Sequence, residues 1–214
     1  MTPVIQLNHI SKTFHHRQVL QDINLTINPG HIYGFSGPNG SGKTLTFKII
    51  LGFVKATQGT VIVNGQTVRH DTMFADGISF AIQEYGLLAN RSGFDNLKLL
   101  TLLADVPDAQ IKPTLKYVGL DPDDQRRLKD YSLGMTQRLL IASALIKDEA
   151  IMIFDEPTNA LDEDGQAFLK TMLRALKQQG KTILLSSHDK AFLEATCDHI
   201  YYFNEGQLKR EAAL

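Results

Sequence analysis

The order of apolar and polar positions divides the chain into three parts. From residue 4 to about residue 63, short β-rich runs such as Val19–Ile27 and Thr60–Val63 alternate with turn residues, which predicts strands. Ile32–Phe35 is expected to form a buried strand that leads into a glycine-rich turn. A helix is predicted next over Lys43–Leu51, ended by Gly52.

The middle part, from about residue 84 to residue 147, has helical character. Two groups of apolar residues recur at helical spacing: Phe94, Leu97 and Leu100, and then Ile111, Leu115 and Val118. Gly119 is a natural stop for the second helix, and Pro113 lies inside its pattern. Because proline disrupts a helix interior, we expect this helix to begin late or to bend at Pro113.

The last third alternates between strands and helices again. Ile151–Phe154 and Thr182–Ser186 are expected to be buried strands. Between them, one apolar helix face is predicted, ended by Gly180 and formed by Leu169, Met172, Leu173 and Leu176. This alternation predicts a parallel sheet with crossover helices, in which ligands bind at the carboxyl ends of the strands. The C-terminal segment around Lys209–Glu211 carries no readable signal.

Composition and charge exclude several classes of protein. The 214 residues would usually form one domain, and 22 basic and 23 acidic residues give a net charge of −1. This balance argues against a protein that binds nucleic acid by neutralising phosphates. The longest uncharged apolar stretch, Leu139–Ile146, is far shorter than the roughly 18 residues that a membrane span needs. No secretory signal is expected, and the single cysteine, Cys197, fits a reducing cytosol.

A phosphate-binding loop is predicted between the strand Ile32–Phe35 and the helix that follows it. The segment matches Gly-x4-Gly-Lys-Ser/Thr and consists of Gly37, Pro38, Asn39, Gly40, Ser41, Gly42, Lys43 and Thr44. The glycines allow backbone N–H groups to surround a β-phosphate at the start of a helix. Lys43 would reach the β- and γ-phosphates of ATP, and the Thr44 hydroxyl would bind Mg²⁺. This loop alone does not separate kinases, GTPases and motor ATPases.

Two carboxylates follow the strand Ile151–Phe154, at the edge of the sheet where the phosphate-binding loop lies. Asp155 would hold Mg²⁺ through its water shell, because this ion keeps several waters. Glu156 can face the γ-phosphate and polarise the attacking water. The alternative is an acidic turn after a core strand, which the neighbouring phosphate-binding loop disfavours.

With these motifs, the chain resembles the nucleotide-binding subunits of ABC transporters over essentially its whole length. Five further matches stand in the family's order: Phe14, Gln83, Tyr131–Met135 followed by Gln137-Arg138, Ala160-Leu161-Asp162, and His188. The resemblance implies that Phe14 stacks on adenine and that Gln83 is a catalytic and metal-binding residue at the junction with a helical lobe. It also implies that Asp162 belongs to a nucleotide-contacting loop and that the catalytic residue His188 senses the γ-phosphate.

The segment Tyr131–Met135 departs from the family signature Leu-Ser-Gly-Gly-Gln at three positions but keeps Ser132 and Gly134. These two residues would open a helix over roughly residues 136–147, whose N-terminus is a second anion site. One phosphate does not need two helix ends from one chain, so the second is expected to serve the ATP of a partner in a two-fold sandwich. The variant signature, Ser186-Ser187-His188 and Cys197–Ile200 resemble bacterial exporters of the peptide-antibiotic and multidrug type.

The resemblance implies an α/β fold with a P-loop NTPase (RecA-like) core, a mainly parallel sheet, an N-terminal antiparallel β subdomain and an inserted α-helical subdomain. The core and β subdomain would comprise residues 1–83 and 148–214, and the helical subdomain residues 84–147 or so. Residues 84–90 would contact a membrane partner.

The expected function is that of an ATP-hydrolysing subunit that powers transport, by export, through a separate polytopic permease. The partners would be that permease and a second ABC ATPase, identical or different, with ATP and Mg²⁺ bound and no nucleic acid. The protein would be cytoplasmic and peripheral on the inner face of the membrane. The alternatives are a non-transport ABC ATPase acting on nucleic acid or ribosomes, and a small-molecule phosphotransferase, which has no use for the segment Ser132–Arg138.

Overall fold

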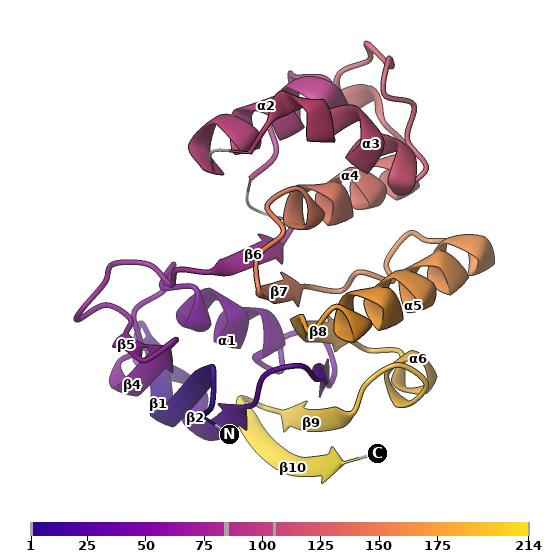
Figure 1. Cartoon of the computed structure of the whole chain (residues 1–214). Coiled ribbons are helices and arrows are strands. Elements are labelled where there is room, and N and C mark those ends of the chain that lie inside the picture. The colour runs from indigo at the N-terminus through magenta and orange to yellow at the C-terminus, as the bar shows by residue number, and fades with distance from the viewer. Residues whose placement is uncertain (1, 84–85, 105, 214) are drawn as a thin grey trace.

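The computed structural model describes residues 2–83, 86–104 and 106–213 (Figure 1). Its strands are β1 (Ile5–Phe14), β2 (Arg17–Ile27), β3 (Ile32–Ser36), β4 (Gln58–Val63), β5 (Gln66–Thr67), β6 (Ile78–Ala81), β7 (Ile151–Phe154), β8 (Thr182–Ser187), β9 (His199–Asn204) and β10 (Gln207–Ala213). Its α-helices are α1 (Lys43–Ile50), α2 (Gly93–Ala104), α3 (Ile111–Tyr117), α4 (Leu133–Leu145), α5 (Glu163–Gln178) and α6 (Lys190–Glu194). Short 3-10 turns cover Asp108–Gln110 and Leu128–Asp130.

The strands form two sheets, as the sequence predicted. An antiparallel sheet has the order β2-β1-β4-β5. The larger sheet has the order β10-β9-β3-β8-β7-β6, in which every neighbouring pair is parallel except β9 and β10. The helices α2, α3 and α4, inserted between β6 and β7, lie together beyond the β6 edge of this sheet (Figure 1). The predicted fold class is therefore confirmed.

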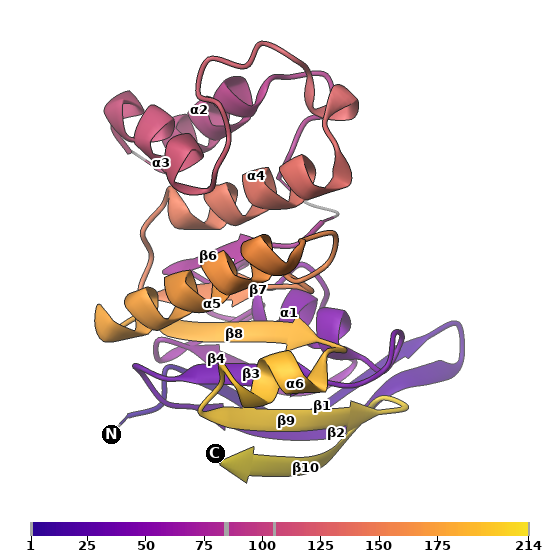
Figure 2. The ribbon, with the colours of Figure 1, turned by 90° about the vertical axis from the view of Figure 1, so that its right-hand side faces the viewer.

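The larger sheet separates two hydrophobic cores, because successive side chains of a strand point to opposite faces. In β7, Ile151 and Ile153 pack with α1 and the antiparallel sheet, whereas Met152 and Phe154 pack with α4, α5 and α6. Figure 2 shows α5 and α6 covering this second face. A strand buried on both faces is apolar at every position, which explains the unbroken run that predicted β7.

The local expectations hold with differences at individual residues. α3 begins at Ile111, so Pro113 lies in its first turn, where the missing N–H costs no helical hydrogen bond. The segment Lys209–Glu211, which gave no signal, belongs to the edge strand β10. Among the described residues, no helix is both long and apolar enough to cross a membrane.

Candidate functional site

The four parallel strands β3, β8, β7 and β6 are neighbours, and their carboxyl ends lead to the candidate residues. The predicted phosphate-binding loop follows β3, and Asp155 follows β7. His188 follows β8, and Gln83 follows β6 after one intervening residue. The parallel order therefore collects residues from distant parts of the chain at one edge of the sheet.

The loop from Gly37 to Thr44 is shaped by close backbone contacts. A Cβ atom on Gly37, whose φ is 155°, would lie 2.4 Å from the carbonyl oxygen of Phe203. Ser41 is 3% exposed, and its Oγ atom has no hydrogen-bond partner within the described part of the chain. A buried hydroxyl without a partner is costly, and a phosphate oxygen would satisfy it. The loop thus fits a bound phosphate group.

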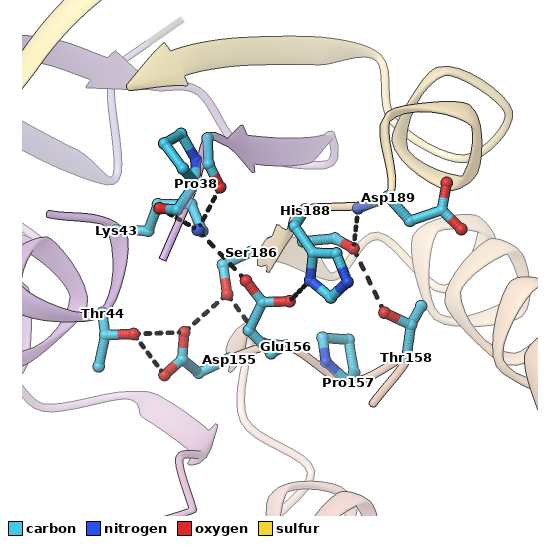
Figure 3. Close-up of polar contacts among 12 residues, drawn as sticks. Pro38, Lys43, Thr44, Asp155, Glu156, Pro157, Thr158, Ser186, His188 and Asp189 are labelled. Atoms are coloured by element: carbon cyan, nitrogen blue, oxygen red, sulfur yellow. Dashed lines mark hydrogen bonds and ion pairs between the residues drawn. The ribbon is translucent and has the colours of Figure 1, made fainter. Parts of the chain in front are cut away.

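Lys43 is 5% exposed and is surrounded by oxygen atoms (Figure 3). Its ammonium donates to the carbonyl oxygens of Gly37 at 2.6 Å and Pro38 at 3.2 Å. It also lies 3.2 Å from Glu156 Oε1, which makes an ion pair. That contact lacks the angles of a hydrogen bond, so Oε1 keeps its capacity to accept one. The lysine places a buried positive charge between the loop and the carboxylates.

Asp155 and Thr44 meet where β7 and α1 converge (Figure 3). The Thr44 hydroxyl lies 3.0 Å and 2.8 Å from the two carboxylate oxygens of Asp155. Burial raises the pKa of Asp155, and hydrogen bonds from Ser186 and Thr44 oppose that rise. A carboxylate and a hydroxyl on separate elements are the hard oxygen ligands that Mg²⁺ prefers, so these residues fit that ion.

Glu156 connects the lysine to the histidine. Its Oε2 atom lies 3.0 Å from Nδ1 of His188, and its Oε1 atom faces Lys43. The backbone of Glu156 has φ 49°, in the left-handed region that residues other than glycine rarely adopt. Such strain persists only where the surroundings hold it, and it is concentrated at functional sites. His188 is exposed, whereas Glu156 is mostly shielded from solvent.

A cavity beside the loop contains the predicted adenine-stacking residue. Phe14 lines it together with Val19, Gly40, Lys43 and Glu156, and Asn39, Gly42, Thr44, Leu45 and Lys48 complete the wall. The Phe14 side chain is 43% exposed, and the Lys12 ammonium lies 4.5 Å from its ring centroid. One face of the ring is therefore covered by a cation.

Gln83 lines a second cavity, which contains Thr44, Asp155 and Glu156 together with Ile82, Gln137 and Asn159. The structure therefore brings this glutamine to the same edge as the predicted metal-binding residues. Of the segment 84–90, which we expected to contact a membrane partner, Glu84 and Tyr85 lie outside the described residues.

The second predicted anion site belongs to the helical subdomain. Ser132 is the N-cap of α4, and its hydroxyl accepts a hydrogen bond from the Met135 N–H at 3.2 Å. The helix begins at Leu133 and ends at Leu145, so the predicted range of 136–147 was wrong at both ends. A Cβ atom on Gly134 would lie 3.1 Å from the carbonyl oxygen of Ala160. Neither Ser132 nor Gly134 takes part in the contacts of Lys43, Asp155 and Glu156 described above.

Asp162 caps another helix. Its side chain accepts a hydrogen bond from the N–H of Gly165 at 2.9 Å, and it starts α5. This is a contact within the chain, and the exposed Asp162 lies outside the cluster at the carboxyl edge of the sheet.

Ser186 is a site residue whose role the motifs did not predict. It is fully buried near the end of β8, donates to Asp155 Oδ1 at 2.6 Å and accepts from the Glu156 N–H at 2.8 Å. The available signal was a pair of serines that follows the apolar run 183–185. Its contact with Asp155 depends on the pairing of β7 with β8, which the sequence alone did not specify.

Comparisons with known proteins relate the chain to one family. A sequence profile described as ABC transporter matches residues 20–159. The lantibiotic transport ATP-binding protein SrtF of Streptococcus pyogenes is 37% identical over 206 residues, which cover 96% of this chain and 89% of SrtF. The bacitracin transport ATP-binding protein BcrA of Enterococcus faecalis is 34% identical over 218 residues, covering 100% of this chain and 70% of BcrA.

Solved structures show the same architecture. The dimeric post-hydrolysis state of the ATP-binding cassette MJ0796, bound to ADP and Pi, has a TM-score of 0.88 at 25% identity. The match covers 98% of both chains. The ADP conformation of MJ1267, an ATP-binding cassette of an ABC transporter, has a TM-score of 0.82 at 21% identity, covers 100% of this chain and 92% of MJ1267, and shares the fold.

Proposed function

Because the chain belongs to the ABC transporter family, as an ATP-binding subunit that hydrolyses ATP to power transport, we propose roles for its residues and partners. The observation that carries the proposal is the convergence of Lys43, Asp155, Glu156 and His188 at the carboxyl ends of adjacent parallel strands. The family membership and the transport proteins among its relatives favour transport over action on nucleic acid or ribosomes.

ATP would bind with its adenine on the face of the Phe14 ring opposite Lys12 and its phosphates in the loop Gly37–Thr44. Backbone N–H groups of the loop and the N-terminus of α1 would hold the β-phosphate, and Lys43 would contact the β- and γ-phosphates. The ammonium of Lys43 is already held among oxygens at this place, so little side-chain ordering remains when nucleotide binds.

Thr44 and Asp155 would hold Mg²⁺, with Gln83 as a further ligand from the neighbouring cavity. A bound divalent cation supplies charge stabilisation to the phosphates when present. Glu156 would polarise the water that attacks the γ-phosphate, since its Oε1 atom has capacity to accept a hydrogen bond from that water. His188 would orient Glu156 and donate a hydrogen bond to the γ-phosphate.

The complete site requires a second cassette, for which we take a second copy of this chain. Ser132 and Gly134 start α4 in the helical subdomain, where the helix N-terminus offers N–H groups to an anion. In a two-fold dimer, each of these ends would face the ATP held by the other copy, with Asp162 at the interface. The MJ0796 cassette is dimeric in a structure with ADP and Pi, which supports this arrangement.

We further propose that the cargo is a peptide antibiotic, moved outward through a separate membrane permease. SrtF and BcrA are named for lantibiotic and bacitracin transport. The ATPase subunit would sit at the cytoplasmic face of the membrane. Residues 86–90 and the helical subdomain would contact the permease and carry the motion of closure.

The variant Glu156→Gln tests the assignment directly. It should bind ATP with unchanged affinity, lose turnover, and accumulate as a dimer in ATP. Turnover at the rate of the unchanged protein would remove Glu156 from the mechanism. For the cargo, expression with the permease that co-purifies should raise the tolerance of a sensitive bacterium to bacitracin or a lantibiotic, and Glu156→Gln should not.

A further inference from the structure

Ser186 lies between the two strands that deliver the reacting groups. β8 pairs with β3, which leads to the phosphate-binding loop, and with β7, which leads to Asp155 and Glu156. The last pair joining β7 to β8 is Phe154 with Leu185. Ser186 is therefore the first residue of β8 beyond this pairing. It lies beside Asp155, the first residue after β7.

The hydroxyl of Ser186 makes two hydrogen bonds with different functions (Figure 3). It donates to the Asp155 carboxylate at 2.6 Å, a length typical of a strong bond to a charged acceptor. It accepts from the backbone N–H of Glu156 at 2.8 Å. One oxygen atom thus fixes the side chain of one carboxylate and the backbone of the next.

The backbone bond bears on the unusual conformation of Glu156. A φ of 49° is unfavourable for a glutamate, so the surrounding contacts have to stabilise it. The N–H bond to Ser186 is such a contact, made at the residue that carries the strain. With this turn held, Oε2 of Glu156 faces His188 and Oε1 faces Lys43.

We propose that Ser186 is a positioning residue for ATP hydrolysis, holding Asp155 and Glu156 in their working geometry through one hydroxyl. This inference rests on the proposed roles of those two carboxylates. Residues that orient a metal ligand from behind typically influence metal affinity or activity by about 10–100-fold. Ser186 does not itself line the nucleotide cavity, and none of its contacts described is to Lys43, so it acts through Asp155 and Glu156.

The adjacent Ser187 provides a matched control. Both serines are fully buried on β8, but the side chains of successive strand residues point to opposite faces. The Ser187 hydroxyl instead lies 3.3 Å from Thr158 Oγ1 and accepts from the N–H of Asp189 at 3.0 Å. Ser187→Ala therefore removes a comparable buried hydroxyl but leaves the hydrogen bonds to Asp155 and from the N–H of Glu156 in place.

The test compares Ser186→Ala, Ser187→Ala, Ser186→Thr and Glu156→Gln in the full chain. Turnover of Ser186→Ala should fall by about 10–100-fold. The gain in affinity for mant-ATP, a fluorescent ATP analogue, on adding Mg²⁺ should shrink by a similar factor, while Mg²⁺-free binding stays the same. Ser186→Thr keeps the hydroxyl and should recover most of the turnover.

Thermal unfolding of each variant separates positioning from folding. Ser186→Ala and Ser187→Ala should lose similar stability, and only the first should lose turnover and the Mg²⁺ effect. Two outcomes would overturn the inference, provided that Glu156→Gln is inactive. One is an equal loss of turnover in the two alanine variants, and the other is a turnover and Mg²⁺ effect of Ser186→Ala within about twofold of those of the unchanged protein. Full turnover in Glu156→Gln would instead remove the proposed function on which the inference rests. If Ser186→Thr does not fold, the two alanine variants decide alone.

Discussion

Nδ1 of His188 lies 3.0 Å from Oε2 of Glu156, although 32 positions separate the two residues in sequence. The contact forms because β7 and β8 are parallel neighbours that end at the same edge of the sheet. Lys43 approaches the other oxygen of the same carboxylate at 3.2 Å. Glu156 is therefore oriented from both sides, which is the arrangement that a water-polarising carboxylate needs.

Replacement of His188 should lower the rate of hydrolysis with little effect on stability. His188→Ala removes an exposed side chain that orients Glu156, so we expect turnover to fall by about 100-fold while ATP binding stays within a factor of about three. Steady-state ATPase assays and nucleotide titrations measure the two effects. His70→Ala is the control, because His70 is also exposed and also contacts a neighbouring carboxylate, Asp71. A His188→Ala protein with full turnover would show that this contact plays no part in hydrolysis.

A methyl group on Gly37 should prevent the loop from holding phosphate. In Gly37→Ala, the new Cβ would meet the backbone oxygen of Phe203 at 2.4 Å, and this strand backbone cannot move aside easily. We expect ATP affinity to fall by more than about tenfold. Gly30→Ala is the control, because Gly30 has φ 78° but no atom within 4 Å of its added Cβ. It should lose about 1 kcal/mol of stability and keep its affinity for ATP. Equal affinities for the two variants would contradict the assignment of the loop.

Loss of the Phe14 ring should weaken nucleotide binding. Stacking on an aromatic side chain contributes about 1–3 kcal/mol per base, so Phe14→Ala should raise the Kd for ATP by roughly 5–150-fold. Phe14→Tyr keeps a ring and should bind nearly as the unchanged protein does. Phe74→Ala is a matched control, since Phe74 is 51% exposed and lies beside the guanidinium of Arg69. Unchanged affinity in Phe14→Ala would place adenine elsewhere.

Asp198 should stabilise the fold in a pH-dependent way. Burial raises the pKa of Asp198, but hydrogen bonds from the Ile32 N–H and from Lys177 outweigh that effect, so its pKa is lowered. A lowered pKa in the folded state means that the stabilisation is present above the unfolded value, about 3.8, and is lost as pH falls below it. Asp198→Asn should therefore lose about 1–2 kcal/mol at pH 7, and the difference should shrink below pH 4 or so. Urea unfolding of both proteins across this range measures it, and a difference independent of pH would contradict the prediction.

The fold was predictable where burial left a clear pattern. β7 is buried on both faces and reads as an unbroken apolar run, and its end delivers Asp155 and Glu156. The edge strand β10 was missed because it pairs only with β9 and carries polar residues around Lys209. An antiparallel edge strand, which has one neighbouring strand, needs no unbroken apolar run.

The site was predictable where a local motif carries the chemistry, and not where tertiary pairing creates it. The loop Gly37–Thr44 can be recognised from the sequence, because a bound phosphate needs consecutive backbone N–H groups and the glycines of the motif make them accessible. Ser132 was expected to open α4, but the start of the helix was placed too late, because the Ser132 hydroxyl caps the Met135 N–H and the first turn begins at Leu133. Neither the strained backbone of Glu156 nor its bond to Ser186 has a local signal, since both depend on β8 lying beside β7.

In the proposed mechanism, each ATP is cleaved between two chains, one providing Lys43 and Glu156 and the other Ser132. Ser132→Arg blocks the second half of the site, and Glu156→Gln disables the first. Each variant alone should be inactive, because every site in its dimer carries one defect. A mixed dimer concentrates both defects in one site and leaves the other intact.

The decisive measurement is the ATPase rate of an equimolar mixture of the two variants after they have exchanged partners. We predict recovery to about a quarter of the activity of the unchanged protein, because half of the dimers are mixed and each has one working site. An inactive mixture, or a Ser132→Arg protein that is fully active by itself, would contradict it.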